Sequence, residues 1–452
     1  MEKARVLALN NLGAARGDYV LYWMQQSQRA EDNDALEYAA RRANELQQPL
    51  VVVFGLTDNY PEANLRHYTF MLEGLRETAK ELARRGIGFV LKMGDPANVA
   101  LNYSQRASLV VCDRGYLRPQ KEWRQEIAGK VRCEVVQVES DVVVPVEVAS
   151  SKREFAARTL RPKIQREMNQ FLHGAKAVKV KCKASLHLKS PSLDNIPELT
   201  HKLRLDKSVE PVSHLFKGGT SEAKKIFRSF CRKNLDHYAR HRNQPQTNDV
   251  SHMSKYLHFG QISPVWLVRE VRKQSYRSRN VLTFIEELVV RRELAMNFVE
   301  FTEDYDSYSC LPEWSRKTLA EHRRDKRAHL YTRKQLEAAE THDPYWNAAM
   351  LEMRHTGYMH NYMRMYWGKK IIEWTRTPEE AFAMVRALNN KYFLDGRDAN
   401  SFASIAWLFG QHDRPWGERP IFGKVRYMNA RGLERKCDIK GYVEKVRRQI
   451  SC

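Results

Sequence analysis

The chain has 452 residues, of which 42% are hydrophobic and 10% aromatic, so it is long enough for two or three folded domains. Its 76 Lys and Arg residues against 54 Asp and Glu residues leave a formal net charge of +22. This charge favours a polyanionic partner through phosphate neutralisation and counterion release, and nucleic acid is the first candidate. A solvated basic surface or a membrane-surface patch would have the same composition.

The cysteine spacing and the hydropathy exclude several classes of protein. The seven cysteines are scattered, with no Cys-x-x-Cys pair, so neither a zinc site nor a disulfide framework is expected. No apolar run approaches the roughly 18 residues of a membrane span, and the N-terminus lacks the apolar stretch of a signal peptide. We therefore expect a cytoplasmic protein that binds no metal and no membrane.

Short apolar runs alternate with helical patterns in the first third of the chain. The apolar runs are YVLYWM at 19, PLVVVFGL at 49, GFVLKMG at 88, SLVVCD at 108 and CEVVQVE at 133, and helical periodicity covers 34–47, 65–85, 97–105 and 118–129. Strands that are apolar throughout indicate a parallel sheet buried on both faces. The pattern predicts a doubly wound, Rossmann-like α/β domain over residues 1–150. A dinucleotide fingerprint and a P-loop are both missing, and Gly86-Ile-Gly88 is interpreted as a helix-to-strand turn.

The alternating pattern ends in a segment rich in Lys, Pro and Ser, and we assign residues 151–219 to an interdomain connection. Its run VKVKCK at 178 could form a basic edge strand or a solvated linker. From Ser221 onward helical periodicity dominates, which predicts an all-α domain over residues 220–452. The expected helices cover 221–240, 263–273, 280–300, 344–354, 357–374 and 377–390.

Residues 341–416 hold five tryptophans together with polar turns such as LDGRDAN. The tryptophans are Trp346, Trp367, Trp374, Trp407 and Trp416. Any one of them could be core filler, because tryptophan is large and apolar. Their grouping with Asn, Asp and Arg residues indicates a redox core instead.

Several long motifs occur in the order in which one family carries them. They are YWMQQSQRAEDNDAL at 22, SKREFAARTLRPKI at 151, YARHRNQPQTNDVSHMSKYLHFGQIS at 238, EELVVRREL at 286, THDPYWNA at 341, DGRDAN at 395 and HDRPWGERPIFGKVRYM at 412. The chain resembles the photolyase and cryptochrome flavoproteins, specifically the class II cyclobutane pyrimidine dimer photolyases. The resemblance implies an N-terminal antenna domain and a helical domain that holds FAD.

The segment from Tyr238 to Gln261 is similar to the loop with which this family embraces its flavin. The resemblance assigns cofactor binding to Tyr238, Val250, Ser251, His252, Met253, Ser254, Arg364, Asp395 and Asn389. Serine hydroxyls and backbone N–H groups where a loop enters a helix suit a pyrophosphate, although Ser251 or Ser254 could simply cap that helix. Arg364 and Asp395 would form a charged pair beside the flavin ring. Arg242 and Asp413 would form a second pair.

Two further sets of residues would serve the redox chemistry. Trp367 and Trp374 are two helical turns apart and could be core residues, but by resemblance Trp367 lies nearest the flavin, Trp346 relays electrons and Trp374 opens to solvent. Asn389 is the candidate partner of flavin N5, since an amide can both accept and donate a hydrogen bond. The alternatives are that Asn389 ends its helix, or that Asn400 has this role.

Glu287 and Trp407 match the family's lesion-binding residues. A carboxylic acid can hydrogen-bond a thymine edge, and an indole can stack on an extruded base. The assigned DNA contacts are Glu287, Arg291, Trp407, Arg414 and Trp416, and the assigned catalytic residues are Glu287, Asn389, Trp407, Arg242 and Asp413. Arg291 replaces a tryptophan of other classes, and it could form an i, i+4 salt bridge with Glu287. Met296 replaces an aspartate that is common in the class.

The resemblance implies a light-dependent lyase in which FADH⁻ donates an electron to a flipped-out cyclobutane pyrimidine dimer in DNA. A cryptochrome-type light receptor without repair activity is the alternative. The short C-terminus and the presence of Glu287, Asn389 and Trp407 favour repair. We expect a monomer, and the N-terminal domain could hold an antenna chromophore of the 8-hydroxy-5-deazaflavin or methenyltetrahydrofolate type.

Overall fold

The computed structural model describes residues 3–184, 190–274 and 278–451, and it divides into two compact units. The sheet unit comprises Met1–Ser151, Arg161–Arg228 and His252–Tyr276. The helical unit comprises Lys152–Leu160, Ser229–Ser251 and Arg277–Cys452. Each unit therefore contains segments that are distant in sequence, and the domain boundaries expected at residues 150 and 219 stay a prediction.

A six-stranded sheet organises the sheet unit, in the order β1-β6-β5-β2-β3-β4. The strands are β1 (Val6–Ala8), β2 (Tyr19–Trp23), β3 (Leu50–Leu56), β4 (Gly88–Met93), β5 (Ala107–Asp113) and β6 (Glu134–Val138). Strands β2 to β6 pair in parallel, as the apolar runs predicted, and β1 adds an antiparallel edge. Gly86, at φ 74°, ends the preceding helix in the left-handed conformation that glycine tolerates, as expected for this turn.

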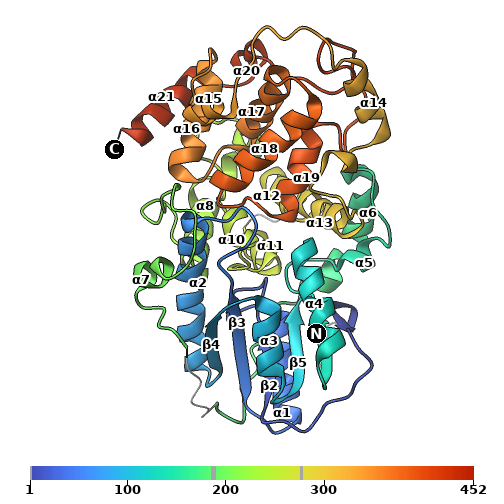
Figure 1. The fold of residues 1–452 in the computed structure, drawn as a ribbon, viewed down its shortest axis with the longest axis vertical. Helices are drawn as coiled ribbons and strands as arrows, with labels where there is room; N and C mark the ends of the chain where they lie inside the picture. Colours follow the sequence, from blue (N-terminus) through green and yellow to red (C-terminus); the bar gives the residue numbers. More distant parts are fainter. Residues whose placement is uncertain (1–2, 185–189, 275–277, 452) are drawn as a thin grey trace. The chain divides into compact units, whose positions relative to one another are not determined.

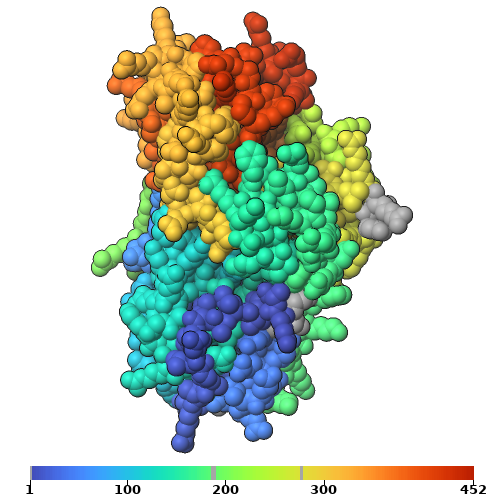
Figure 2. All heavy atoms as spheres, turned by 90° about the vertical axis from the view of Figure 1, so that its right-hand side faces the viewer, coloured from blue at the N-terminus to red at the C-terminus, as the bar shows by residue number. Residues whose placement is uncertain are grey.

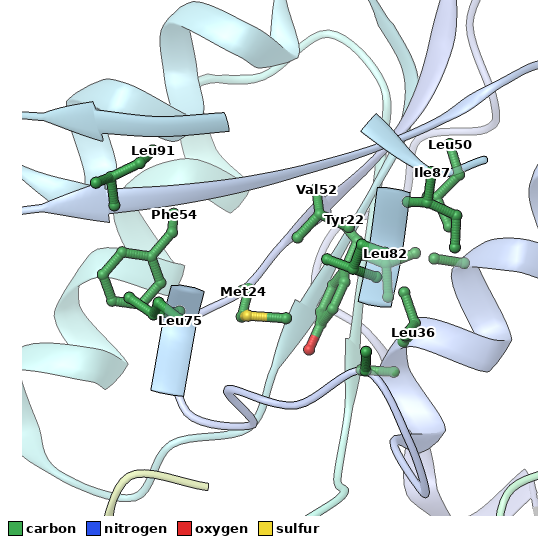
Figure 3. Packing of buried hydrophobic residues seen from close by; sticks show 14 of the residues in the cluster. Tyr22, Met24, Leu36, Leu50, Val52, Phe54, Leu75, Leu82, Ile87 and Leu91 are labelled. Atoms are coloured by element: carbon green, nitrogen blue, oxygen red, sulfur yellow. The ribbon is translucent and has the colours of Figure 1, made fainter. Parts of the chain in front are cut away.

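Helices cover both faces of this sheet (Figure 1). α1 (Asp34–Glu45) and α2 (Leu65–Arg84) pack on one face, and α3 (Pro96–Ser104) and α4 (Arg118–Lys130) pack on the other. In Figure 3, Leu36 of α1 and Leu75 and Leu82 of α2 lie beside Tyr22 and Val52 of the sheet and Met24, which directly follows β2. Two buried hydrophobic layers, one on each face of the sheet, make the doubly wound fold that the sequence predicted.

The segment VKVKCK is not a strand in the structure. Val178 and Val180 pack into the core beneath α1, while the lysines are exposed. The backbone N–H of Lys181 donates to Asn44 Oδ1 at 2.8 Å, and Asn44 Nδ2 donates to the Lys179 carbonyl at 2.9 Å. The edge-strand alternative is therefore wrong, and the segment is an anchored connection along α1.

The remaining elements of the sheet unit are short. They are η1 (Lys3–Arg5), α5 (Val146–Ala149), η2 (Met168–Phe171), α7 (Ile196–His201), α10 (Ser254–His258) and α11 (Pro264–Arg272). Two helices, α6 (Ala157–Glu167) and α8 (Thr220–Lys233), contain residues of both units.

The helical unit is all-α, as predicted. Its elements are η3 (Leu235–His237), α9 (Tyr238–His241), α12 (Arg279–Ile285), η4 (Glu286–Arg291), α13 (Arg292–Glu300), η5 (Tyr308–Cys310), α14 (Glu313–Glu321), α15 (Arg333–Ala338), α16 (Pro344–Thr356), α17 (Asn361–Trp374), α18 (Pro378–Tyr392), α19 (Ala399–Leu408), α20 (Ala430–Lys436) and α21 (Ile439–Ile450). Figure 2 shows the light-orange segment that includes α14 at the surface.

Local sequence signals set the ends of the central helices of this unit. Asp343 caps α16 through the backbone N–H groups of Tyr345 and Trp346, with Pro344 at the first helical position, and Gly357 ends it at φ 67°. Thr377 caps α18 in the same way, ahead of Pro378. No helix in the described ranges is both long and apolar enough to cross a bilayer.

Candidate functional site

Arg364 and Asp395 form the predicted ion pair. The guanidinium of Arg364, on α17, donates to both carboxylate oxygens of Asp395, at 2.9 and 3.1 Å. The same guanidinium lies over the ring of Phe393, 3.8 Å from its centroid, and Phe393 contacts Trp367 edge to face at 6.3 Å. The pair therefore joins α17 to the turn after α18, and it lies in the same cluster as the tryptophan expected nearest the flavin.

Asn389 lies inside α18, which continues to Tyr392, so the alternative that Asn389 ends this helix is wrong. Its amide nitrogen donates to Asn390 Oδ1 at 2.9 Å and to Ser401 Oγ at 2.6 Å. Within the described residues its amide oxygen accepts no hydrogen bond. The side chain is only 6% exposed, and an amide oxygen that stays open there can accept from a ring N–H of a bound cofactor. Asn400, the fallback candidate, is half-buried at the start of α19.

The three ladder tryptophans form one cluster on α16 and α17. Trp346 and Trp374 contact each other edge to face, with ring centroids 5.5 Å apart, and Trp346 Nε1 donates to the Trp367 carbonyl at 3.0 Å. Trp346 thus lies between the other two, as a relay would. Trp374 was expected to open to solvent, but it is only 1% exposed, so this expectation is wrong.

Two residues that the sequence reasoning missed surround Trp374. The rings of Tyr331 and His342 each lie 5.3 Å from it, and the Tyr331 hydroxyl lies 2.7 Å from His342 Nδ1. His342 is exposed and Tyr331 is half-buried, so the solvent side of the ladder consists of these two rings. Tyr331 lies in the basic run HRRDKRAHLYTRK, where nothing distinguishes it from a surface residue.

Arg242 pairs with Glu287 and not with Asp413. The distance from Arg242 Nη2 to Glu287 Oε1 is 2.6 Å, whereas Asp413 binds Arg426 at 3.0 Å, so the predicted pair of Arg242 and Asp413 is wrong. Burial raises the pKa of Glu287, although Arg242 and Arg291 lower it. A carboxyl group whose pKa is raised can keep its proton and donate it in a hydrogen bond.

Arg291 does not pair with Glu287 either, because residues 286–291 form a π-helix. The wider turn brings Arg291 Nε to Glu286, five residues back, at 3.3 Å, which corrects the expected i, i+4 bridge. Glu287 thereby keeps its orientation toward Arg242. Met296, the second departure from the class, is buried on α13.

The predicted DNA contacts around Trp407 form an alternating series of rings and cations. Arg426 lies 5.6 Å from the Trp407 ring and 4.2 Å from the Trp416 ring, and Arg414 lies 5.3 Å from the Trp416 ring. Asp413 fixes this loop, because its carboxylate accepts from the backbone N–H of Arg414 and from Trp416 Nε1. Trp407 is half-buried and Trp416 is 40% exposed, so both rings have area left for a partner.

The predicted phosphate-binding run divides between the two units. Val250 and Ser251 belong to the helical unit, and His252, Met253 and Ser254 belong to the sheet unit. α10 begins at Ser254 after Met253, so neither serine is its N-cap residue. Within the described residues the hydroxyls of Ser251 and Ser254 make no hydrogen bond, and His252 has a positive φ of 57°. Strained backbone and free hydroxyls are typical of an anion-binding loop.

Further buried donors of the helical unit have no acceptor in the described part of the chain. Trp367 Nε1 is one of them, and the tryptophan is 2% exposed. His360 is another: its Nδ1 accepts from the Tyr362 N–H, so Nε2 carries the proton, and no acceptor meets it. Burial lowers the pKa of His360 to about 3, which keeps the ring neutral. Buried donors of this kind are suited to the acceptor atoms of a polar ligand.

In the sheet unit, a second group of polar side chains lies at the carboxyl ends of β2 and β5. Asp113 accepts from the backbone N–H groups of Gln25, Gln26 and Ser27 at 2.9 to 3.0 Å and from the Tyr22 hydroxyl at 2.7 Å. Beside this fixed loop, the Gln25 amide and Trp23 Nε1 are buried without partners in the described residues. The strand order reverses between β5 and β2, and α/β folds bind ligands at such a point.

Known proteins resemble this chain over almost its whole length. A model of the DNA photolyase family matches residues 20–181. A deoxyribodipyrimidine photo-lyase from Methanothermobacter thermautotrophicus is 50% identical over 437 residues, which cover 96% of this chain and 95% of that protein. A deoxyribodipyrimidine photo-lyase from Oryza sativa subsp. japonica is 40% identical over 98% of this chain and 90% of its own length.

Solved structures share the fold. A crystal structure of an archaeal photolyase from Sulfolobus tokodaii, described as containing two FAD molecules, superposes with a TM-score of 0.69 at 16% identity. The match covers 94% of this chain and 89% of that one. With two relatives at 40% and 50% identity that it covers almost completely, this chain belongs to the deoxyribodipyrimidine photo-lyase family.

Proposed function

We propose that this chain is a light-dependent DNA repair lyase of class II that splits cyclobutane pyrimidine dimers into two pyrimidines. The observation that carries the activity is the near-complete alignment with deoxyribodipyrimidine photo-lyases at 38% to 50% identity. The class rests on the motifs of the sequence and on relatives from an archaeon, plants and a marsupial.

FAD is the cofactor that the helical unit suits. When bound and reduced, FAD would act as a one-electron donor that light can excite. The Asn389 amide oxygen would accept from the ring N5–H, and the pair of Arg364 and Asp395 would offer charge beside the ring. The free hydroxyl of Ser251, in the same unit, would bind the pyrophosphate.

The tryptophan cluster would return electrons to the cofactor from outside. Trp367, Trp346 and Trp374 are in contact in this order, through a hydrogen bond and an edge-to-face ring contact. Because Trp374 is buried, electrons would reach it through the Tyr331 and His342 rings.

DNA would be bound in two ways. The net charge of +22 provides sequence-independent attraction to phosphates, and Arg291 and Arg414 are exposed cations next to the assigned lesion residues. Trp407 would stack on an extruded base, and the Glu287 carboxyl group would donate a hydrogen bond to a pyrimidine carbonyl.

The site at the carboxyl ends of β2 and β5 would take an antenna chromophore. A flat aromatic molecule with polar edges could satisfy the buried Gln25 amide and Trp23 Nε1.

The test is repair in light and in darkness by the purified protein. Its absorption spectrum should contain flavin bands, and the reduced protein should remove dimers from an oligonucleotide only when illuminated. Flavin bands without repair would favour the cryptochrome-type receptor. No flavin bands after reconstitution with FAD would contradict the proposed cofactor site.

A further inference from the structure

Lys369 is a fully buried lysine on α17, beside the indole that we assign to the lesion. Its side chain is 0% exposed. Nζ donates to the carbonyl of Leu408, the last residue of α19, and lies 5.4 Å from the centroid of the Trp407 ring. Lysine is rarely buried unless it is paired, and within the described residues Lys369 has no ion-pair partner. A buried, unpaired ammonium group needs an explanation.

The glycine before it allows this placement. A Cβ on Gly368 would lie 2.2 Å from Leu408 Cδ1, so a larger residue would force the Leu408 side chain to move, and glycine lets α17 lie close to the end of α19 without that shift. The next residue, Lys369, then reaches the carbonyl end of α19, where the helix dipole favours a positive charge. Two adjacent residues thus dock α17 against the residue that follows Trp407.

This placement costs stability. Burial lowers the pKa of Lys369 to about 7, and of the charged groups that face it Asp413 raises this pKa and Arg426 lowers it. A methionine of similar length would fill the space without that desolvation. Groups that cost stability and touch an assigned site are often kept for function.

We propose that Lys369 is a positioning residue for lesion recognition, whose ammonium group holds the Trp407 indole and the end of α19 in the orientation that stacks on an extruded pyrimidine. The proposal rests on the proposed function, because Trp407 has this role only if the chain binds dimers. Lys369 acts through the ring: a cation beside an indole restricts its orientation, and Leu408 fixes the backbone next to it.

The first test compares Lys369→Met with the parent protein. The dissociation constants for dimer-containing and undamaged DNA of the same sequence are measured, and their ratio is the readout. We expect this ratio to be about threefold to tenfold smaller in the variant. A partly desolvated cation–π contact contributes a free energy of that size. Its melting temperature should not fall. Lys391→Met is the matched control, because Lys391 also contacts a ring, that of Tyr392, at 5.1 Å on α18.

The second test needs no variant. As the pH rises through about 7, Lys369 loses its proton, so the binding ratio of the parent should fall between about pH 6 and pH 8.5. In Lys369→Met the ratio should be low throughout, and it should keep only the pH dependence that Glu287 contributes to both proteins. A purely structural role would leave both pH profiles parallel. If the variant does not fold, the parent profile decides, and a flat profile overturns the proposal.

The variant Trp407→Ala distinguishes a failure of the positioning role of Lys369 from a failure of the lesion role of Trp407. If Trp407→Ala lowers the ratio and Lys369→Met leaves it unchanged, the positioning role is wrong and the lesion role of Trp407 stands. If Trp407→Ala leaves the ratio unchanged, the lesion assignment itself fails. In the positioning role, Lys369→Met has no further effect on the ratio once Trp407 is alanine.

Discussion

Arg242 Nη2 lies 2.6 Å from Glu287 Oε1, so the carboxyl group assigned to the lesion has a guanidinium partner directly after α9. Burial raises the pKa of Glu287, and Arg242 is the largest effect that opposes this rise. The pair therefore sets the fraction of Glu287 that carries a proton. The π-helix at 286–291 makes this possible, since it directs Arg291 to Glu286.

Replacing Arg242 with Gln should raise the pKa of Glu287 further, because the main opposing charge is lost. Infrared difference spectra of the carboxyl band across pH would measure the shift. Repair by prereduced protein should keep its activity to higher pH if protonated Glu287 is the active form. Arg240→Gln is the control, as Arg240 binds the His241 ring and is not paired with Glu287. An unchanged carboxyl titration would show that the ion pair does not control Glu287.

Replacing Trp367 with Phe should nearly abolish photoreduction of oxidised FAD and leave repair by chemically prereduced protein intact. The physical reason is that the cluster of Trp367, Trp346 and Trp374 refills the flavin without touching the lesion. Bleaching of the oxidised flavin band under blue light is the measurement. Trp314→Phe, outside the cluster, should photoreduce at the parent rate. If Trp367→Phe also does so, the ladder assignment is wrong.

Replacing Asn389 with Leu should shorten the lifetime of the reduced flavin in air, because the N5 hydrogen-bond partner is lost. Asn400→Leu is the matched variant, since the two amides are the competing candidates. Stopped-flow reoxidation of both proteins decides between them. Faster reoxidation in Asn400→Leu alone would move the role to Asn400.

His322 predicts a pH-dependent step in stability. Its Nε2 lies 3.0 Å from Glu418 and its Nδ1 lies 2.6 Å from Asp325, and these carboxylates raise the pKa of His322. Since the folded pKa is raised, the stabilisation is complete below pH 6.5 and is lost as the pH rises through the folded value. The melting temperature of the parent should therefore fall more between pH 6 and pH 9 than that of His322→Asn, by roughly 2 °C or more. High salt should shrink the difference, and equal pH profiles would contradict it.

The fold was predictable because its signals are local. Buried parallel strands are apolar throughout, as in Leu50–Leu56, and the helices between them have clear periodicity. Strand β1 was missed because it is only three residues long, Val6–Ala8, and none of them is buried. These residues become a strand only by pairing with β6. No local pattern marks such an edge.

Of the two ion pairs expected in the candidate site, one could be predicted from the sequence and the other could not. The pair of Arg364 and Asp395 followed from the motifs, but the partner of Arg242 depends on a π-helix that no sequence rule indicates. No sequence pattern marks Lys369 as buried, since lysine is normally exposed. Only the packing of α17 against the end of α19 shows that Lys369 is buried.

Replacing Trp407 with Ala should separate lesion recognition from general DNA affinity. Phosphate neutralisation depends on the net charge of +22 and falls steeply with salt, whereas the indole contributes only when a base leaves the stack. Stacking on an aromatic ring is worth about 1 to 3 kcal/mol per base, so binding to dimer-containing DNA should weaken by about tenfold or more. Undamaged DNA should bind almost as before, with the same salt slope.

The control for this prediction is Trp416→Ala. Trp416 is 40% exposed and stacks on Arg426, which also contacts the Trp407 ring, but it lies in the loop after α19. If both variants lose affinity for damaged DNA alone, the lesion surface extends from Trp407 across Arg426 to Trp416. If Trp407→Ala loses affinity equally for damaged and undamaged DNA, its indole supports the fold, and the stacking role has to be assigned elsewhere.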